Sequence, residues 1–118
     1  MKILHVGDPH FSKNLLDKCL AVSRQIESIA QEKNPDLIVI PGDLQDKLLT
    51  VEDGSAYSEM LQHIQNLAEI APIAILYGNA THDPVGSLEP LKLLKTKHPI
   101  CISDYPQTIY LHHHHNSN

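Results

Sequence analysis

The chain has 118 residues, enough for one domain with a hydrophobic core that needs no disulfide bonds, and too few to suggest a second domain. Its hydrophobic fraction of 42% and charged fraction of 19% are ordinary for a globular protein and argue against extended disorder. The formal net charge of −5 gives no basic footprint of a general nucleic-acid binder, although divalent metals in an acidic pocket would still permit a nucleic-acid substrate.

Strand-like and helix-like segments alternate along the chain. The stretches 2–6, 37–40 and 73–77 are short, rich in β-branched residues and bounded by Pro or Gly, which predicts buried parallel strands. Apolar residues recur at helical spacing between them, over residues 16–30 and 60–68. The order β-α-β-α-β predicts an α/β fold built on a parallel sheet with right-handed crossovers.

Shorter elements are expected in the rest of the chain. Residues 87–96 are typical of a short helix that is capped by Ser87. Residues 100–103 and 108–111 predict two further short strands.

Nothing in the sequence predicts export or membrane insertion. The apolar run at the start is too short for a signal peptide, and no stretch approaches the length of a membrane span. Cys19 and Cys101 form no C-x-x-C pair and are expected to be buried thiols in a reducing compartment, which predicts a cytoplasmic protein. Residues 1–111 are expected to form the domain, and residues 112–118, which contain four adjacent His, a tag or flexible tail.

Each of the first three predicted strands is followed by a loop rich in metal-binding residue types. The loops read G-D-P-H at 7–10, G-D-L-Q-D at 42–46 and G-N-A-T-H-D at 78–83. Because ligands gather beyond the carboxyl ends of parallel strands, the three loops are expected to share one site. Each loop begins with Gly, which allows the backbone to turn sharply toward a common point.

The side chains of these loops form a mixed oxygen and nitrogen ligand set, which suits Mn²⁺, Fe²⁺ or Zn²⁺ better than Ca²⁺. Two metals fit if Asp43 bridges them, because bridged ions about 3.5–4 Å apart can grip one phosphoryl group. A nearby His that binds no metal can then protonate the leaving oxygen. The alternative is turn chemistry, since Gly-Asp and Gly-Asn are common turn pairs.

The three loops resemble the first three motifs of the calcineurin-like metallophosphoesterases, which are D-x-H, G-D-x-x-D and G-N-H-D/E, in the same order. The resemblance covers approximately residues 2–104 and is strongest to the SbcD-type exonuclease subunit of double-strand-break repair. It implies the first half of the family's αββα sandwich. The G-H-x-H motif that family members carry in a later sheet has no counterpart in this sequence.

The resemblance also implies which residues bind metal. Asp8 and His10 would bind a first divalent ion, Asp43 would bridge both ions, and Asn79 would bind the second. The expected ion is Mn²⁺, with Fe²⁺ or Zn²⁺ as alternatives.

The implied reaction is in-line attack on a phosphodiester by hydroxide bound to the metals. His82 would be the catalytic residue that assists departure of the leaving oxygen. Asp46 and Asp83 would orient neighbouring ligands, as carboxylates beside a metal site do.

One departure from the family motif concerns His82. The motif has His directly after Asn, whereas Ala80 and Thr81 intervene here. A loop bulge that returns His82 to the site is favoured because Asp83 follows it, as the motif requires. In the alternative, Asn79 still binds metal and His82 loses its catalytic role.

The remaining His residues are poor ligand candidates. His63 falls within a helical pattern and is expected at the surface, and His98 precedes a Pro. His5 lies inside a predicted strand, where it could lie near the site and contact the metal ligands without binding metal. The run 112–115 lacks the alternating geometry of a G-H-x-H loop.

The resemblance implies a nuclease that acts on DNA beside an SMC-like ATPase. A small-molecule phosphodiesterase or phosphoprotein phosphatase is the near alternative. The alternative from another class is a non-catalytic, truncated or degenerate module that acts in protein association. A half-fold would leave one sheet face uncovered, so association of two copies through that face is also expected.

Overall fold

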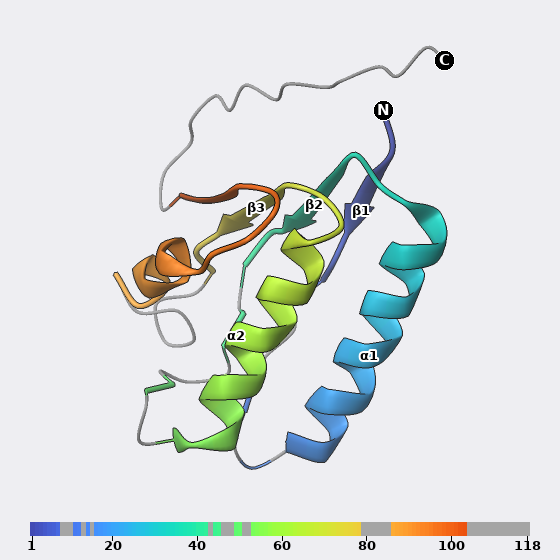
Figure 1. Cartoon of the computed structure of the whole chain (residues 1–118). Coiled ribbons are helices and arrows are strands. Elements are labelled where there is room, and N and C mark those ends of the chain that lie inside the picture. The colour runs from blue at the N-terminus through green and yellow to red at the C-terminus, as the bar shows by residue number, and fades with distance from the viewer. Residues whose placement is uncertain are drawn as a thin grey trace.

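The computed structural model describes residues 1–7, 11–12, 14, 16–42, 44–45, 49–50, 53–78 and 86–103. Four strands in these ranges form one parallel sheet in the order β1-β2-β3-β4. Figure 1 labels the first three, which lie behind the helices in that view. The strands are β1 (Ile3–His5), β2 (Leu37–Ile40), β3 (Ile73–Leu76) and β4 (Ile100–Ser103). The parallel α/β fold predicted from the alternation of segments is therefore confirmed. The strand expected at 108–111 lies outside the described residues.

Helices connect the successive strands and lie on one side of the sheet. These are α1 (Leu16–Lys33), α2 (Ser55–Ala68) and the 3-10 helix η2 (Glu89–Leu93). Right-handed crossovers between strands that follow one another in sequence order place every connection on the same face. Figure 1 shows α1 and α2 lying side by side across that face.

The helix α1 ends where its backbone turns into the left-handed region. Asn34 has φ 47°, and its backbone N–H donates to the carbonyl oxygen of Ala30 at 2.9 Å. Asn tolerates this conformation better than most residues, and Pro35, which follows, cannot continue a helix. The chain thus leaves α1 directly into β2, because only residues 34–36 separate the two elements.

The core lies between the helices and the sheet. Ile38 and Ile40 of β2 and Ile73 and Ile75 of β3 are at most 1% exposed, since alternate residues of each strand face α1 and α2. The buried face of α2 meets them with Met60, Ile64, Leu67 and Ala68. Burial of each large aliphatic side chain contributes about 1.5–3 kcal/mol to folding.

The opposite face of the sheet is not covered by any helix of the described part of the chain. Its side chains include Ile3, which is 54% exposed, and Leu76, which is 40% exposed. Leu37 and Val39 of the central strand β2 are half-buried there, unlike their neighbours on the helix side. The face is apolar, and the self-association expected through it stays a prediction.

The segment after β3 differs from the helix predicted over 87–96. It forms only the short 3-10 helix η2, which is preceded by Leu88 in the capping position without a side-chain hydrogen bond. The expected cap by Ser87 is therefore wrong, and the Ser87 hydroxyl instead accepts a hydrogen bond from Gln45.

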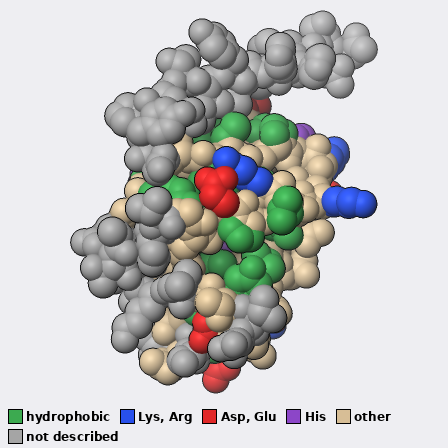
Figure 2. All heavy atoms as spheres, turned by 90° about the vertical axis from the view of Figure 1, so that its left-hand side faces the viewer, with side chains coloured by type: hydrophobic (Ala, Val, Ile, Leu, Met, Phe, Trp, Pro, Cys, Tyr) green, Lys and Arg blue, Asp and Glu red, His purple; other side chains and the backbone are tan. Residues whose placement is uncertain are grey.

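Figure 2 shows the surface on this side of the molecule, where hydrophobic side chains lie around adjoining basic and acidic groups. The Lys92–Glu89 ion pair at 2.8 Å belongs to η2.

The structure also bears on the burial of the two cysteines and on membrane-spanning helices. Cys19 and Cys101 form no disulfide bond and are only half-buried, so the expectation that both are buried is wrong. No helix among the described residues is long and apolar enough to span a bilayer.

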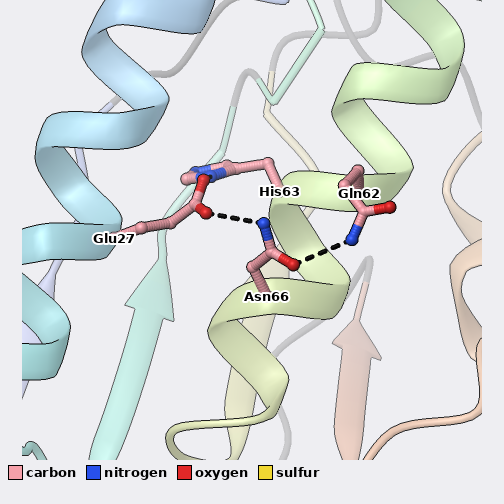
Figure 3. Close-up of polar contacts among 4 residues, drawn as sticks. All are labelled: Glu27, Gln62, His63 and Asn66. Carbon is pink, nitrogen blue, oxygen red and sulfur yellow. Dashed lines mark hydrogen bonds and ion pairs between the residues drawn. The ribbon is translucent and has the colours of Figure 1, made fainter.

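A buried polar cluster joins α1 to α2, contrary to the expectation that His63 is at the surface. His63 is 2% exposed, and its Nδ1 lies 2.7 Å from Oε2 of Glu27 in α1. The Asn66 amide donates to Oε1 of Glu27 at 2.6 Å, and Gln62 donates to Asn66 at 2.8 Å. Figure 3 shows Glu27 reaching across the helix pair to both His63 and Asn66.

The surroundings of Glu27 shift its pKa in opposing directions. Desolvation raises the pKa, whereas hydrogen bonds from His63 and Asn66 and the charges of His63 and Arg24 lower it; the net pKa is below the ordinary value of 4.5. A carboxyl group with a lower pKa in the folded state stabilises that state above its unfolded pKa. This contribution is lost as the pH falls below 4.5 and through the lowered folded pKa.

We predict that Glu27→Gln lowers the free energy of unfolding at pH 7 by about 1–3 kcal/mol, because the hydrogen bonds to a half-buried ionised acceptor are lost or weakened. The difference between the wild type and the variant should shrink as the pH is lowered below 4.5. Urea denaturation between pH 3 and pH 7 measures both effects. Glu89→Gln is the control, since its ion pair with Lys92 is exposed and its removal should change little. A pH-independent difference for Glu27→Gln would contradict this account.

Candidate metal centre

All seven residues predicted to bind metal, to act in catalysis or to orient ligands lie outside the described residues. They are Asp8, His10, Asp43, Asp46, Asn79, His82 and Asp83. Their roles therefore stay predictions. The described residues that flank them in the chain define the frame from which the three loops start.

The three loops leave the sheet at one edge. Gly7, Gly42 and Gly78 each follow the carboxyl end of a strand, and the three strands are parallel neighbours. The ladder continues past β1, because the N–H of Val6 donates to the carbonyl oxygen of Val39 at 2.9 Å. The common edge expected for the three loops is thus confirmed for the residues at which they begin.

The segment beyond the first loop pairs with the segment beyond the second. The N–H of Phe11 donates to the carbonyl oxygen of Leu44 at 2.8 Å, and Phe11 forms a parallel bridge with Gln45. Phe11 is 1% exposed and Leu44 is fully buried. The D-P-H loop is therefore held at both ends, by Val6 on β2 and by Phe11 beside Leu44.

The second and third loops begin in close contact. A Cβ atom placed on Gly42 would lie 2.8 Å from the Cα atom of Gly78, a distance at which the backbones would have to separate. Gly42 also has φ 149°, which side chains of L-residues rarely allow. Glycine at position 42 therefore serves both the turn and the close approach of the loops.

The Gln45 side chain connects the second loop to the returning end of the third. It is fully buried, and its Nε2 donates to the Ser87 hydroxyl oxygen at 3.0 Å. Its Oε1 accepts a hydrogen bond from the N–H of Leu49 at 3.0 Å. Next to Ser87, the N–H of Leu88 donates to the hydroxyl oxygen of Tyr77, which follows β3, at 3.1 Å.

A second buried polar side chain lies beside this frame. The ring of His63 is tilted by 44° against the ring of Phe11, with centroids 5.5 Å apart. Nδ1 of His63 faces the Glu27 carboxylate, whereas Nε2 lies at the other side of the ring. This Nε2 is buried and has no hydrogen-bond partner in the described part of the chain.

A solvent-filled groove of about 580 Å³ lies away from this frame. Its lining includes Lys92, Lys95, Lys97 and His98. The N–H of Ile73 donates to the carbonyl oxygen of Pro99, so the groove adjoins the amino-terminal ends of β3 and β4. It therefore belongs to the edge of the sheet opposite the candidate metal centre.

The frame fits a metal site by the chemistry of the residues that it carries. Carboxylate, imidazole and amide donors in the three loops form a ligand set suited to Mn²⁺, Fe²⁺ or Zn²⁺. Among the described residues, no group of three or more His, Cys, Asp or Glu could hold an ion. A metal at this edge would thus depend on the predicted ligands of the loops.

The sequence analysis missed Gln45 and His63 as members of the frame. Gln45 lies within the G-D-L-Q-D loop, but nothing local identifies a partner that is 42 positions away. For His63 a signal exists, because the spacing from Met60 to Leu67 places position 63 on the apolar face of α2.

Comparison of the sequence with models of known protein families gives a match over nearly the whole chain. A model described as calcineurin-like phosphoesterase matches residues 1–117. No curated protein matches the chain closely enough to be reported as similar.

We predict that Gly42→Ala destabilises the protein in two ways. Strain from the positive φ costs about 1–3 kcal/mol, and the contact with Gly78 adds an overpacking cost of about 1–3 kcal/mol. The matched control is Gly54→Ala, because Gly54 also has a positive φ, of 57°, but an added Cβ would meet nothing within 4 Å. Urea denaturation of both variants measures the difference. Equal destabilisation would show that the approach of the two loops does not need glycine.

Proposed function

The chain belongs to the calcineurin-like phosphoesterase family, and from this membership we propose that it hydrolyses phosphodiester bonds at the carboxyl ends of β1, β2 and β3. The family itself indicates metal-dependent phosphoester hydrolysis. One observation supports this location. Gly7, Gly42 and Gly78, at which the three motif loops start, lie at the same edge of the sheet, and Gly42 contacts Gly78.

In the proposed site, the loop residues hold the metals and the reacting groups. Asp8 and His10 would hold one divalent ion, Asn79 would hold another, and Asp43 would be a ligand of both. When bound, the ions supply positive charge for the phosphoryl oxygens and lower the pKa of a water molecule. Mn²⁺ is the proposed ion.

In the proposed reaction, His82 protonates the leaving oxygen. Water first releases a proton to solvent, and the oxygen of the resulting hydroxide would then form a bond to phosphorus while the bond from phosphorus to the leaving oxygen breaks. His82 donates a proton to that leaving oxygen, so that an alcohol and a phosphomonoester result. Asp46 and Asp83 orient the neighbouring loop side chains.

DNA is the proposed substrate, as in the SbcD-type exonucleases that the opening motifs resemble, with an SMC-like ATPase as the proposed partner. The acidic net charge of −5 means that attraction of DNA would depend on the bound ions rather than on the overall charge of the chain. A small-molecule phosphodiester is the alternative substrate. The insertion of Ala80 and Thr81 supports a second candidate function, a module that keeps the fold without catalysis.

We predict that the chain with His112–His115 changed to Ala binds two Mn²⁺ ions, and that adding Asp43→Asn removes both together, because a bridging carboxylate serves each ion. Isothermal titration calorimetry measures the stoichiometry. Changing the His run first prevents its imidazoles from binding metal. Binding of fewer than two ions by the parent chain, or loss of only one in the variant, would contradict the bridged pair.

Hydrolysis assays with Mn²⁺ then separate the candidate functions. Cleavage of single- or double-stranded DNA supports the nuclease, whereas hydrolysis of bis(p-nitrophenyl) phosphate without cleavage of DNA favours a small substrate. Two bound ions without hydrolysis of any substrate would favour the non-catalytic module. His82→Ala should lower the rate by about 10²–10⁴-fold if His82 acts as the acid.

A further inference from the structure

Gln45 stands out because this one buried residue links the surroundings of all three motif loops, through its backbone and its side chain. Its backbone bridges to Phe11, which follows the first loop, and its own position lies in the second loop. Its Nε2 reaches Ser87, which follows the third loop. The side chain is 0% exposed, so these contacts are shielded from competing water.

The Gln45 amide is fixed from both of its ends. The N–H of Leu49 donates to Oε1, which determines the orientation of the amide and directs the NH₂ group toward Ser87. Loss of either hydrogen bond costs more for a buried amide than for an exposed one, because water does not replace the lost partner. The two hydrogen bonds therefore stabilise one relative position of the second loop and Ser87.

The third loop has a particular need for such a contact. It starts at Gly78, which is fixed against Gly42, and it carries the two residues by which this sequence departs from the family motif. A longer loop that is held at only one end has more conformations available to it. Ser87 provides the second point of attachment, on the far side of Asn79 and His82 in the chain.

We propose that Gln45 is a positioning residue whose hydrogen bond fixes Ser87, where the chain returns from the third loop, beside the second loop, and that this attachment favours metal binding by ligands of both loops. The proposal rests on the proposed function, because it assigns the purpose of this hydrogen bond to metal binding. Neither Gln45 nor Ser87 touches the reacting atoms in this scheme. Both act through the loops that they hold.

The test removes the hydroxyl of Ser87 and then restores it. Ser87→Ala should weaken Mn²⁺ binding in calorimetry by about 10–100-fold, the usual effect of losing a group that supports metal ligands. Ser87→Thr keeps a hydroxyl and should bind within about threefold of the wild type, well inside the tenfold that corresponds to 1.4 kcal/mol. Mn²⁺ affinity that is unchanged in Ser87→Ala would overturn the proposal.

Thr96→Val is the matched control for loss of a side-chain hydrogen bond. The Thr96 hydroxyl donates to the carbonyl oxygen of His98 at 2.6 Å, at the opposite edge of the sheet. The variant should leave Mn²⁺ affinity unchanged even if it lowers stability. An equal loss of affinity in Thr96→Val and Ser87→Ala would mean that general destabilisation is responsible, which would overturn the positioning role.

A double-mutant cycle tests whether Gln45 and Ser87 act together. Gln45→Leu removes both polar atoms at similar volume and should weaken Mn²⁺ binding at least as much as Ser87→Ala. The double variant should bind no worse than Gln45→Leu alone, because the same contact is already lost. Losses that multiply in the double variant would show that the two residues act independently, against the proposal.

Hydrogen exchange without metal distinguishes failure of this inference from failure of the proposed function. In Ser87→Ala, the amide of Leu49 should exchange faster, since the Gln45 amide that accepts its hydrogen bond is no longer held by Ser87. A wild type that binds no Mn²⁺, together with this faster exchange, would refute the metal centre and leave the contact as a structural clamp. Unchanged exchange at Leu49 would refute the clamp itself, whatever the metal binding.

Discussion

The parallel sheet imposes the constraint on which the rest of the structure depends. Because all the described strands run in one direction, every strand must deliver its carboxyl end to the same edge, where α1 and α2 also begin. Loops that are far apart in sequence therefore start beside one another. The contact of Gly42 with Gly78 and the hydrogen bond from Phe11 to Leu44 are local consequences of that shared direction.

Buried polar side chains connect this edge to the helix layer. Gln45 joins the second loop to Ser87, and His63 lies between Glu27 of α1 and the ring of Phe11. An apolar core would be stable without either, and each adds a desolvation cost that only a specific partner offsets. Their value is geometric, since a hydrogen bond defines direction where hydrophobic contact defines only proximity. Both side chains adjoin the edge of the sheet at which the three motif loops begin.

The sequence predicted the sheet closely because strands and their boundaries are encoded locally. Residues 37–40 match β2, since a continuous apolar run that ends at Pro41 leaves little choice of limits. The helix expected over 87–96 is shorter in the structure, because Ser87 is used by Gln45 rather than as a cap and Leu94 is already extended. The helical spacing places His63 on the apolar face of α2, but it could not identify the partner Glu27, which is 36 positions away. The motif residues of the candidate site came from the sequence, whereas the frame that flanks them depends on contacts of long sequence separation.

The sequential strand order has a consequence for how the molecule folds. Each strand pairs with the strand that precedes it in the chain, so every new pairing closes a loop of only one helix and its connections. Such a topology has a lower contact order than a sheet in which distant strands must meet, and lower contact order favours rapid folding. The sheet can thus grow by adding one strand at a time in chain order. A mutation that slows the pairing of β1 with β2 would then delay every later step of assembly.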